Sequence, residues 1–445
     1  MTDGLNLPFA GEDIARRLSH TLEEPDWLLE DRLDAFHRYA SLPPETNRLY
    51  TTYLDLRAAR FGEIEPYSET GEAVEVSFTV PEGAAAILQV DEDRVVARGM
   101  SREARDAGVV ADSFVNVLRD QPQLLRDAVT SGTSLPADDK FAQFARAHAA
   151  IGVVVHVPPG VALARPIVVR WSAGAPGRGL VSRTIVTLGA NASANVLEEQ
   201  VPSTGSANGT QSLWWGTTEI DVGQGASLSF AGQQDFGPDT LAFVNRQATI
   251  GRDAQLRWAL ASVGAQLHKS RIDNRLAGRG ATVHQAEIGF GSGSQLFDLT
   301  SYTRHIAEDT TGDLLSKGVF LDRARGFFKG MISIERTARG TDSVLGEFGM
   351  NLSPKARAVA IPSLEIDQPD VRRAMHSSSV GPIDEGQVFY LQSRGLPRDV
   401  ARKFIVMGFL EPVVARIPLA EAQDRLREVL EAKWPEESAE PAAAA

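Results

Sequence analysis

The middle of the chain, from about residue 150 to about residue 367, alternates apolar and polar positions with a period of two, which is typical of β-strands. A short motif recurs inside it: a glycine, two variable residues, an alanine, one more residue, then the start of a strand-like run. The four copies begin at Gly189, Gly223, Gly251 and Gly278. They are spaced by 34, 28 and 27 residues, in the range where repeats indicate a solenoid.

Two architectures explain this repeat. Glycine permits a positive φ at a tight corner, and alanine lets one corner stack closely on the next, so the motif predicts a β-helix. Ordinary hairpin turns in a β-sandwich would produce the same periodicity, which therefore does not separate the two. Ser353, Ala356 and Ala358 have the form of a degenerate fifth copy.

Both ends of the chain have helical periodicity. The sequence predicts a helix that opens at Glu23–Leu28 and ends at Pro43-Pro44, short strands at 75–80 and 86–90, and a helical segment at 110–130. We expect four regions, which are a mostly helical N-terminal domain (1–150), a β core (151–370), a C-terminal helical domain (371–434) and a disordered tail (435–445). The tail contains mainly proline, glutamate and alanine, a composition that cannot form a core.

The C-terminal region carries helix boundary signals. Asp384 with Gln387 is typical of an N-cap with its capping-box partner, Gly395 of a C-terminal stop, and Pro397 of a first helical turn. The last helix is predicted to have one apolar face, formed by Ala422, Leu426, Val429 and Leu430.

Charge and composition exclude several partners. The net charge is −13 over 445 residues, with no basic stripe to bind nucleic acid. No apolar run reaches the ~18 residues that a membrane span needs, so we expect no membrane partner. The first residues lack the basic region and apolar stretch of a signal peptide, and we expect a cytoplasmic protein.

The chain contains no cysteine. Disulfides, cysteine-ligated zinc, cysteine-ligated iron–sulfur clusters and cysteine nucleophiles are therefore excluded. The glycine-rich run 289–293 lacks the Lys-Ser/Thr of a P-loop, so the chain should not bind ATP. The acidic pairs Glu198-Glu199 and Glu308-Asp309 are expected to be solvated charge on exposed strands or turns.

The histidines show no metal-binding spacing. His305 is expected to be a hydrogen-bonded core residue, because its neighbours alternate as in a strand. His156, His268 and His284 are expected to be strand residues that face solvent.

The most specific pattern runs from Pro362 to Phe409. It reads P-x-LEI at 362–366, PDV at 369–371, an isolated His376 in a short loop, Gly381, Asp384, VFYLQSRG at 388–395 and Gly408-Phe409. This order resembles the C-terminal signature of the SufB/SufD family, the scaffold proteins of SUF iron–sulfur cluster assembly. No cysteine precedes His376, and Ser377 follows it where SufB proteins tend to carry glutamate, which favours the SufD side of the family.

The resemblance implies a right-handed parallel β-helix with α-helical domains at both ends. It also implies a non-catalytic, SufD-like scaffold subunit that pairs with a SufB-like paralogue and docks a SufC-like ABC-type ATPase. No cofactor would be bound by the chain alone, and an iron–sulfur cluster would assemble transiently at the interface with the partner chain. His376 becomes a candidate iron ligand, with a hydrogen-bonded loop histidine as the alternative. The candidate partner contacts are Phe389, Tyr390, Leu391, Arg394, Gly395, Gly408 and Phe409.

Two other functions stay open. A SufB-like scaffold would be expected to carry a thiolate, which this chain lacks. A β-helix polysaccharide lyase or hydrolase would predict secretion and an aromatic-lined groove. Only 7% of the residues are aromatic, which disfavours that enzyme.

Overall fold

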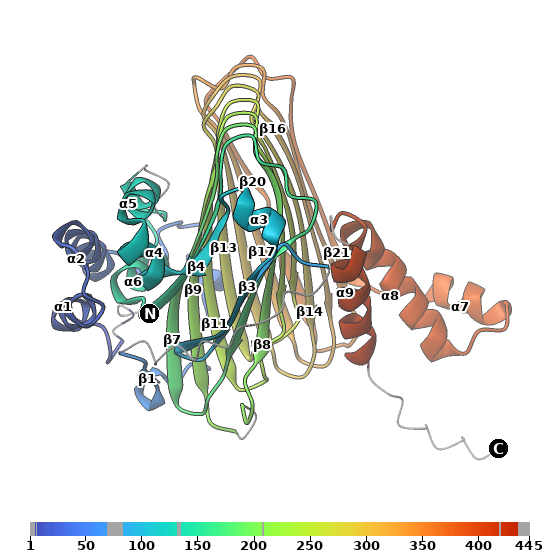
Figure 1. The fold of residues 1–445 in the computed structure, drawn as a ribbon. Helices are drawn as coiled ribbons and strands as arrows, with labels where there is room; N and C mark the ends of the chain where they lie inside the picture. The colour runs from blue at the N-terminus through green and yellow to red at the C-terminus, as the bar shows by residue number, and fades with distance from the viewer. Residues whose placement is uncertain are drawn as a thin grey trace.

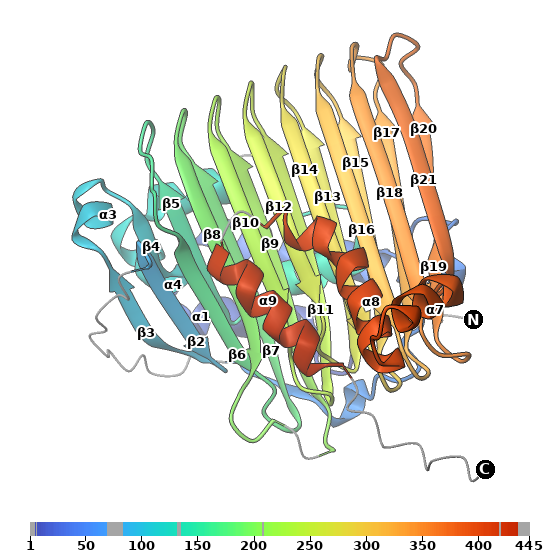
Figure 2. The same cartoon turned by 90° about the vertical axis from the view of Figure 1, so that its right-hand side faces the viewer.

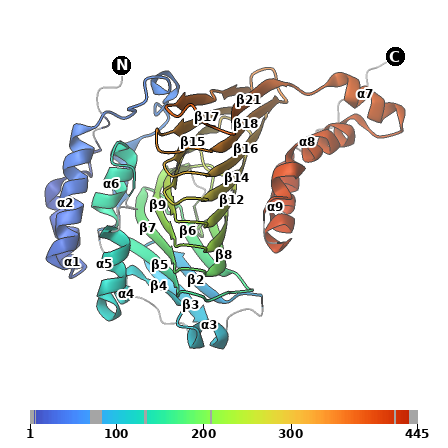
Figure 3. The ribbon, with the colours of Figure 1, turned by 90° about the horizontal axis from the view of Figure 1, so that it is seen from above.

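The chain forms a flattened, right-handed parallel β-helix with helices on two opposite sides (Figures 1 and 3). This computed structural model describes residues 5, 7–68, 83–130, 135–206, 209–417 and 420–434. The predicted strand at 75–80 and the predicted disordered tail at 435–445 lie outside the described residues. The β-helix prediction is confirmed, and the β-sandwich alternative is wrong.

Successive coils contribute one strand to each of two sheets, and the strands of each sheet run parallel except for one antiparallel pair per sheet at the first coil (Figure 2). The first sheet, sheet A, contains β4 (Val110–Ser113), β5 (Ile151–Val157), β7 (Arg178–Leu188), β9 (Ser212–Val222), β11 (Thr240–Ile250), β13 (Leu267–Leu276), β15 (Leu296–His305), β17 (Arg325–Ile334), β19 (Arg357–Ala360) and β20 (Ser363–Ile366), with β1 (Glu65–Pro66) beside β7. The second, sheet B, contains β3 (Arg94–Met100), β2 (Ala86–Asp91), β6 (Ile167–Ala173), β8 (Ser193–Pro202), β10 (Ser227–Gln234), β12 (Gln255–Ser262), β14 (Thr282–Gly291), β16 (Thr311–Phe320), β18 (Asp342–Asn351) and β21 (Arg373–Pro382).

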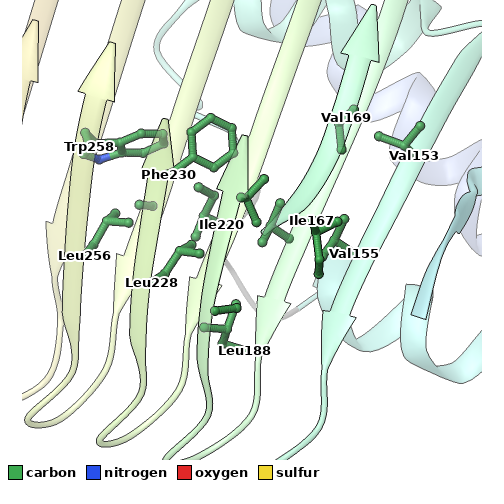
Figure 4. Close-up of a cluster of buried hydrophobic side chains, with 14 of the residues drawn as sticks. Val153, Val155, Ile167, Val169, Leu188, Ile220, Leu228, Phe230, Leu256 and Trp258 are labelled. Atoms are coloured by element: carbon green, nitrogen blue, oxygen red, sulfur yellow. The ribbon is translucent and has the colours of Figure 1, made fainter. Parts of the chain in front are cut away.

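The interior of the β-helix is built from columns of inward side chains, because parallel strands in register place equivalent residues above one another. In sheet B, Phe230 lies beside Trp258, and Leu228 beside Leu256. Figure 4 shows these side chains meeting the inward side chains of sheet A, such as Ile220. All of them are buried, so hydrophobic burial holds successive coils together.

The repeated glycine has a different role from the predicted one. In each copy the positive φ belongs to the residue two positions later, at Asn191, Gly225, Asp253 and Gly280. The first glycine instead lies against the backbone of the preceding coil. A Cβ at Gly251 would lie 2.8 Å from the carbonyl oxygen of Val222, and one at Gly278 would lie 2.0 Å from the nitrogen of Arg252. Close stacking of corners therefore explains this glycine, and the explanation by positive φ is wrong.

The proposed fifth copy at Ser353 is also wrong, because it lies at the opposite corner of the β-helix. It leads into β19 of sheet A, whereas the four true copies lead into strands of sheet B. Ser353 belongs to a ladder in which its hydroxyl accepts a hydrogen bond from the Asp322 amide at 2.9 Å. The Asp322 carboxylate in turn accepts one from the Gly293 amide at 2.7 Å.

The N-terminal helices cover the outer face of sheet A (Figure 3). They are α1 (Glu12–Thr21), α2 (Asp26–Ser41), α4 (Phe114–Asp120), α5 (Pro122–Thr130) and α6 (Lys140–His148), with α3 (Arg102–Asp106) at the first coil. The predicted helix after Pro25 is confirmed as α2. The interface is aromatic, since the Phe144 and Trp215 rings lie 4.3 Å apart.

The prediction of a strand at 86–90 is confirmed as β2. The predicted helical segment 110–130 begins instead with strand β4.

The C-terminal helices lie on the side of sheet B (Figure 2). They are α7 (Glu385–Ser393), α8 (Arg398–Val414) and α9 (Ala420–Ala432). Asp384 caps α7 by accepting hydrogen bonds from the backbone amides of Gly386 and Gln387, and Gly395 has a φ of +94°, so the predicted N-cap and C-terminal stop are confirmed. The capping-box role of the Gln387 side chain stays a prediction. Pro397 is the N-cap residue of α8, one position before the predicted first turn.

Polar contacts attach α8 and α9 to sheet B. The Lys317 ammonium donates to the carbonyl oxygen of Phe409 at 2.7 Å, and Arg416 pairs with Asp313 at 3.2 Å. On α9, Arg425 pairs with Glu199. The predicted apolar face of α9 is confirmed, because Ala422, Leu426 and Leu430 are buried and Val429 packs beside them.

The expectation that Glu198 and Glu199 are solvated is wrong. Both side chains are buried. Glu198 faces the interior of the β-helix, where the guanidinium of Arg246 pairs with it at 3.0 Å. Glu199 lies on the outer face, between Arg170 and Arg425, so two arginines offset the cost of burying its charge.

Candidate functional site at the open end and the C-terminal helices

The C-terminal end of the β-helix is open. Strand β21 pairs with β18 along one edge, and within the described parts of the chain no strand pairs with its other edge. It is 10 residues long, and most of its side chains are exposed. An unpaired edge of this length presents backbone donors and acceptors to another chain.

His376 lies in this edge strand, so its predicted place in a loop is wrong. The run Ser377–Ser379 has weak strand propensity, and pairing with β18 overrides it. His376 is the Cα partner of the buried Leu345. Since Ala374 packs into the interior cluster and side chains alternate along a strand, His376 lies on the same inward face. It is exposed because no further coil follows.

The surroundings of His376 do not complete a metal site. Among the residues that the structure describes, no three His, Asp or Glu side chains are grouped so as to hold a metal ion. A metal bound at His376 would therefore need ligands from another molecule. Exposed apolar side chains share this end, namely Ile366, Met375 and Val380, which is the composition of a surface that another chain covers.

A second candidate surface lies where α7 and α8 leave the β-helix. A groove of about 770 Å³ runs between the two helices and the end of sheet B. It is lined mainly by apolar groups, which include Met350, Pro382, Tyr390, Leu391, Phe404, Ile405, Gly408 and Phe409. Four of the predicted contact residues are thus brought together here, namely Tyr390, Leu391, Gly408 and Phe409.

The other predicted contacts have separate positions. Phe389 does not line the groove and is 72% exposed. The Arg394 guanidinium lies 5.2 Å from the centre of the Tyr390 ring, so it extends the same surface by a cation–π contact. Gly395 is not among the residues that line this groove, and it follows the C-terminal end of α7. Phe389 and Tyr390 are both exposed, so neither ring is buried against the end of the β-helix.

Sequence reasoning missed Phe404, which lines the groove and is 67% exposed. Its spacing of four residues from Gly408 on α8 was the available signal, because residues four apart share a helix face. Phe409 makes a cation–π contact with sheet B, because the Lys317 ammonium lies 4.6 Å from the centre of its ring. Burial lowers the pKa of Lys317.

The other four histidines for which the sequence predicted a place all lie in strands of the β-helix. His305 is fully buried, with its ring nitrogens 2.8 Å from the Thr310 hydroxyl and 2.9 Å from the Ser343 hydroxyl, so the core prediction is confirmed. Burial lowers its pKa to about 4. The prediction for His268 is wrong, because its side chain faces the interior and is buried. Its pKa falls to about 3 through burial and the nearby charge of Arg246. His156 and His284 are partly buried on their strands.

The sequence that forms most of the β-helix and the first C-terminal helices matches the model of a known protein family. Residues 170–409 match the family model described as "SUF system FeS cluster assembly, SufBD core domain". The chain therefore belongs to the SufB/SufD family of iron–sulfur cluster assembly proteins of the SUF system.

Within that family the likeness is to SufD. The chain is 26% identical over 443 residues to the protein named iron–sulfur cluster assembly protein SufD of Bacillus subtilis, a match that covers 97% of this chain and 100% of the relative. It is 25% identical over 436 residues to an iron–sulfur cluster assembly SufBD family protein of Staphylococcus saprophyticus, covering 94% of this chain and 91% of the relative. Among the described residues, no helix is both long and apolar enough to cross a membrane.

Proposed function

We propose that this chain is a non-catalytic, SufD-like scaffold subunit of the SUF system. It pairs with a SufB-like paralogue through the open end of the β-helix and docks a SufC-like ATPase on α7 and α8. The observation that carries this proposal is the combination of an unpaired edge strand with a cysteine-free sequence. The partner must then supply the thiolates, and the edge gives it a place to join.

The open end suits a second β-helix. A partner strand on the free edge of β21 would satisfy its backbone groups, and the exposed Ile366, Met375 and Val380 would bury apolar surface on the same contact.

The groove between α7 and α8 suits a protein partner with an apolar anchor. Its lining is mostly apolar and aromatic, and Arg394 stands at its rim on the Tyr390 ring. Aromatic residues and arginine are the side chains enriched where interface energy concentrates. Force applied by an ATPase here would reach sheet B through the contacts of Lys317 and Arg416.

His376 is the chain's contribution to cluster assembly in this proposal. A neutral imidazole is a good donor to iron, and the residue projects from the edge strand toward the space that a partner would close. The cluster is then cargo, assembled transiently at the junction and completed by ligands of the partner chain.

Co-expression of the chain with its genomic neighbours tests the proposal. A stable complex with an ATPase and a cysteine-bearing paralogue is expected. The double variant Met375→Lys/Val380→Lys should release the paralogue, because lysine on an exposed edge opposes strand pairing. Glu30→Lys, an exposed change on α2, is the matched control. Retention of the paralogue by the double variant would place the junction elsewhere.

A further inference from the structure

The strand of sheet A that follows β17 is broken in two. β19 pairs with Arg325–Phe328, and β20 pairs with Met331–Ile334. Between them, Lys329 and Gly330 have Cα partners on β15 but none on the side of β19 and β20. The opposite segment contains Pro362, which has no amide hydrogen to donate. This break lies in the last coil, beside the open end.

A glutamate from the opposite sheet crosses the interior to reach this break. Glu347 lies on β18 of sheet B, and its side chain is buried. The Ile361 amide donates to the Phe328 carbonyl oxygen of β17 at 2.9 Å and also to a carboxyl oxygen of Glu347 at 3.1 Å. The Gly330 amide bonds the same carboxyl group. Glu347 thus links the two sheets where regular pairing stops.

The Gly330 peptide lies directly against the Glu347 carboxyl group, and the absence of a side chain there leaves room for that group. A Cβ on Gly330 would lie 2.6 Å from the carboxyl oxygen of Glu347 and 2.5 Å from a methyl group of Leu345, so a larger residue would displace the carboxyl group. From the outer face, the Tyr50 hydroxyl donates to the Gly330 carbonyl oxygen at 3.1 Å. The Gly330 peptide is therefore held from inside by Glu347 and from outside by Tyr50.

Within the described ranges of the chain, no cation pairs with Glu347. Ser316 on β16 and Ser378 on β21 are its neighbours in register, and His376 lies two residues along the same face of β21. Glu287 on β14 is the next acid in the column, beyond Ser316, and Tyr50 lies behind Gly330. The nearest interior arginine, Arg246, pairs with Glu198 instead.

We propose that Glu347 is a titratable brace across the broken last coil, and that loss of its proton loosens the open end of the β-helix. An ionised carboxylate here is a buried charge without a counter-ion, which is costly. Water entering at the break would solvate that charge and separate β19 and β20 from β17. The brace acts within this chain by itself and does not depend on any partner.

The direction of the effect follows from the site. Burial, opposed by the two amide donors and reinforced by the charge of Glu287, raises the pKa of Glu347 to about 8, above its ordinary value of 4.5. The folded chain therefore holds the proton more strongly than the unfolded chain, and raising the pH through this range favours opening.

Hydrogen-exchange mass spectrometry of the purified full chain tests the proposal. After correction for intrinsic rates, exchange in peptides spanning 357–366 should rise by up to about a hundredfold between about pH 6 and about pH 8 and level off at higher pH, because between the ordinary and the raised pKa each pH unit changes the opening equilibrium about tenfold. Peptides from β9 to β12 should show no such rise. Glu347→Gln removes the titration and should reduce the rise to less than about twofold.

Two further variants separate the brace from general destabilisation. Glu287→Gln should keep the rise but move it to lower pH, because a like charge near Glu347 is removed. Tyr50→Phe should increase exchange at both pH values while keeping the pH response, and it serves if Glu347→Gln does not fold. No rise in the wild-type chain, or an equal rise in Glu347→Gln, would overturn the proposal.

Discussion

The stacking of corners predicts an unusually large penalty for the smallest possible substitution, Gly278→Ala. The added Cβ would lie 2.0 Å from the Arg252 nitrogen, 2.3 Å from the Gly251 carbonyl carbon and 2.4 Å from the Arg252 Cα. All three are backbone atoms, so relief requires one coil to move away from the next. Overpacking in a close-packed core costs about 1–3 kcal/mol, and we expect a loss of at least about 3 kcal/mol because no flexible side chain can yield.

Gly293→Ala is the matched control. Gly293 has a φ of +59°, yet nothing lies within 4 Å of its added Cβ, so its cost is backbone strain alone, about 1–2 kcal/mol. Urea denaturation followed by circular dichroism and by tryptophan fluorescence compares the variants at equal protein concentration. Gly278→Ala should lower the midpoint clearly more than Gly293→Ala. Equal midpoints would show that coil stacking is loose at this corner and refute the reasoning.

Four other outcomes are expected. The chain alone should bind no iron–sulfur cluster after anaerobic reconstitution, as judged by absorption spectroscopy, because it has no thiolate; a stoichiometric cluster would contradict this. Arg394→Glu should weaken pull-down of the ATPase without changing the melting temperature, and unchanged pull-down would place that interface elsewhere. His376→Ala should reduce cluster yield in the assembled complex while folding and assembly persist; full yield would leave His376 a structural residue. Burial raises the pKa of Glu287 to about 7, so stability should fall between about pH 4.5 and about pH 7 by up to about 3 kcal/mol, and Glu287→Gln should flatten that part of the profile.

The repeat of glycine and alanine predicted stacked or hairpin corners but did not separate a β-helix from a β-sandwich, and the family resemblance was needed to choose the β-helix. The same local rule misplaced Ser353, since a corner of either sheet has a similar sequence. His376 and Glu198 were misjudged for one shared reason. Pairing with a distant strand decided that His376 lies in β21, and pairing with the distant Arg246 decided that Glu198 is buried. Such long-range partners have no local signal.

The groove was only half predictable. Tyr390 and Leu391 lie in a recognisable motif, but Met350 comes from β18, and its approach to α8 depends on how the helices fold back over sheet B. The pKa of Glu347 was likewise beyond sequence reasoning, because it depends on a break in the opposite sheet.

The two ends of the β-helix are built differently, which limits how the chain can assemble. At the first coil, β3 and β4 turn antiparallel to their neighbours β2 and β5, and Arg98 of β3 pairs with Asp112 of β4. A charged pair thus ties the two sheets together where β21 leaves the other end free. The edge strands at the first coil are short, with 7 residues in β3 and 4 in β4, so they offer a further molecule a poorer template than the 10 residues of β21. Solenoids that are open at both ends can grow into fibres, and this asymmetry favours a closed pair over a filament.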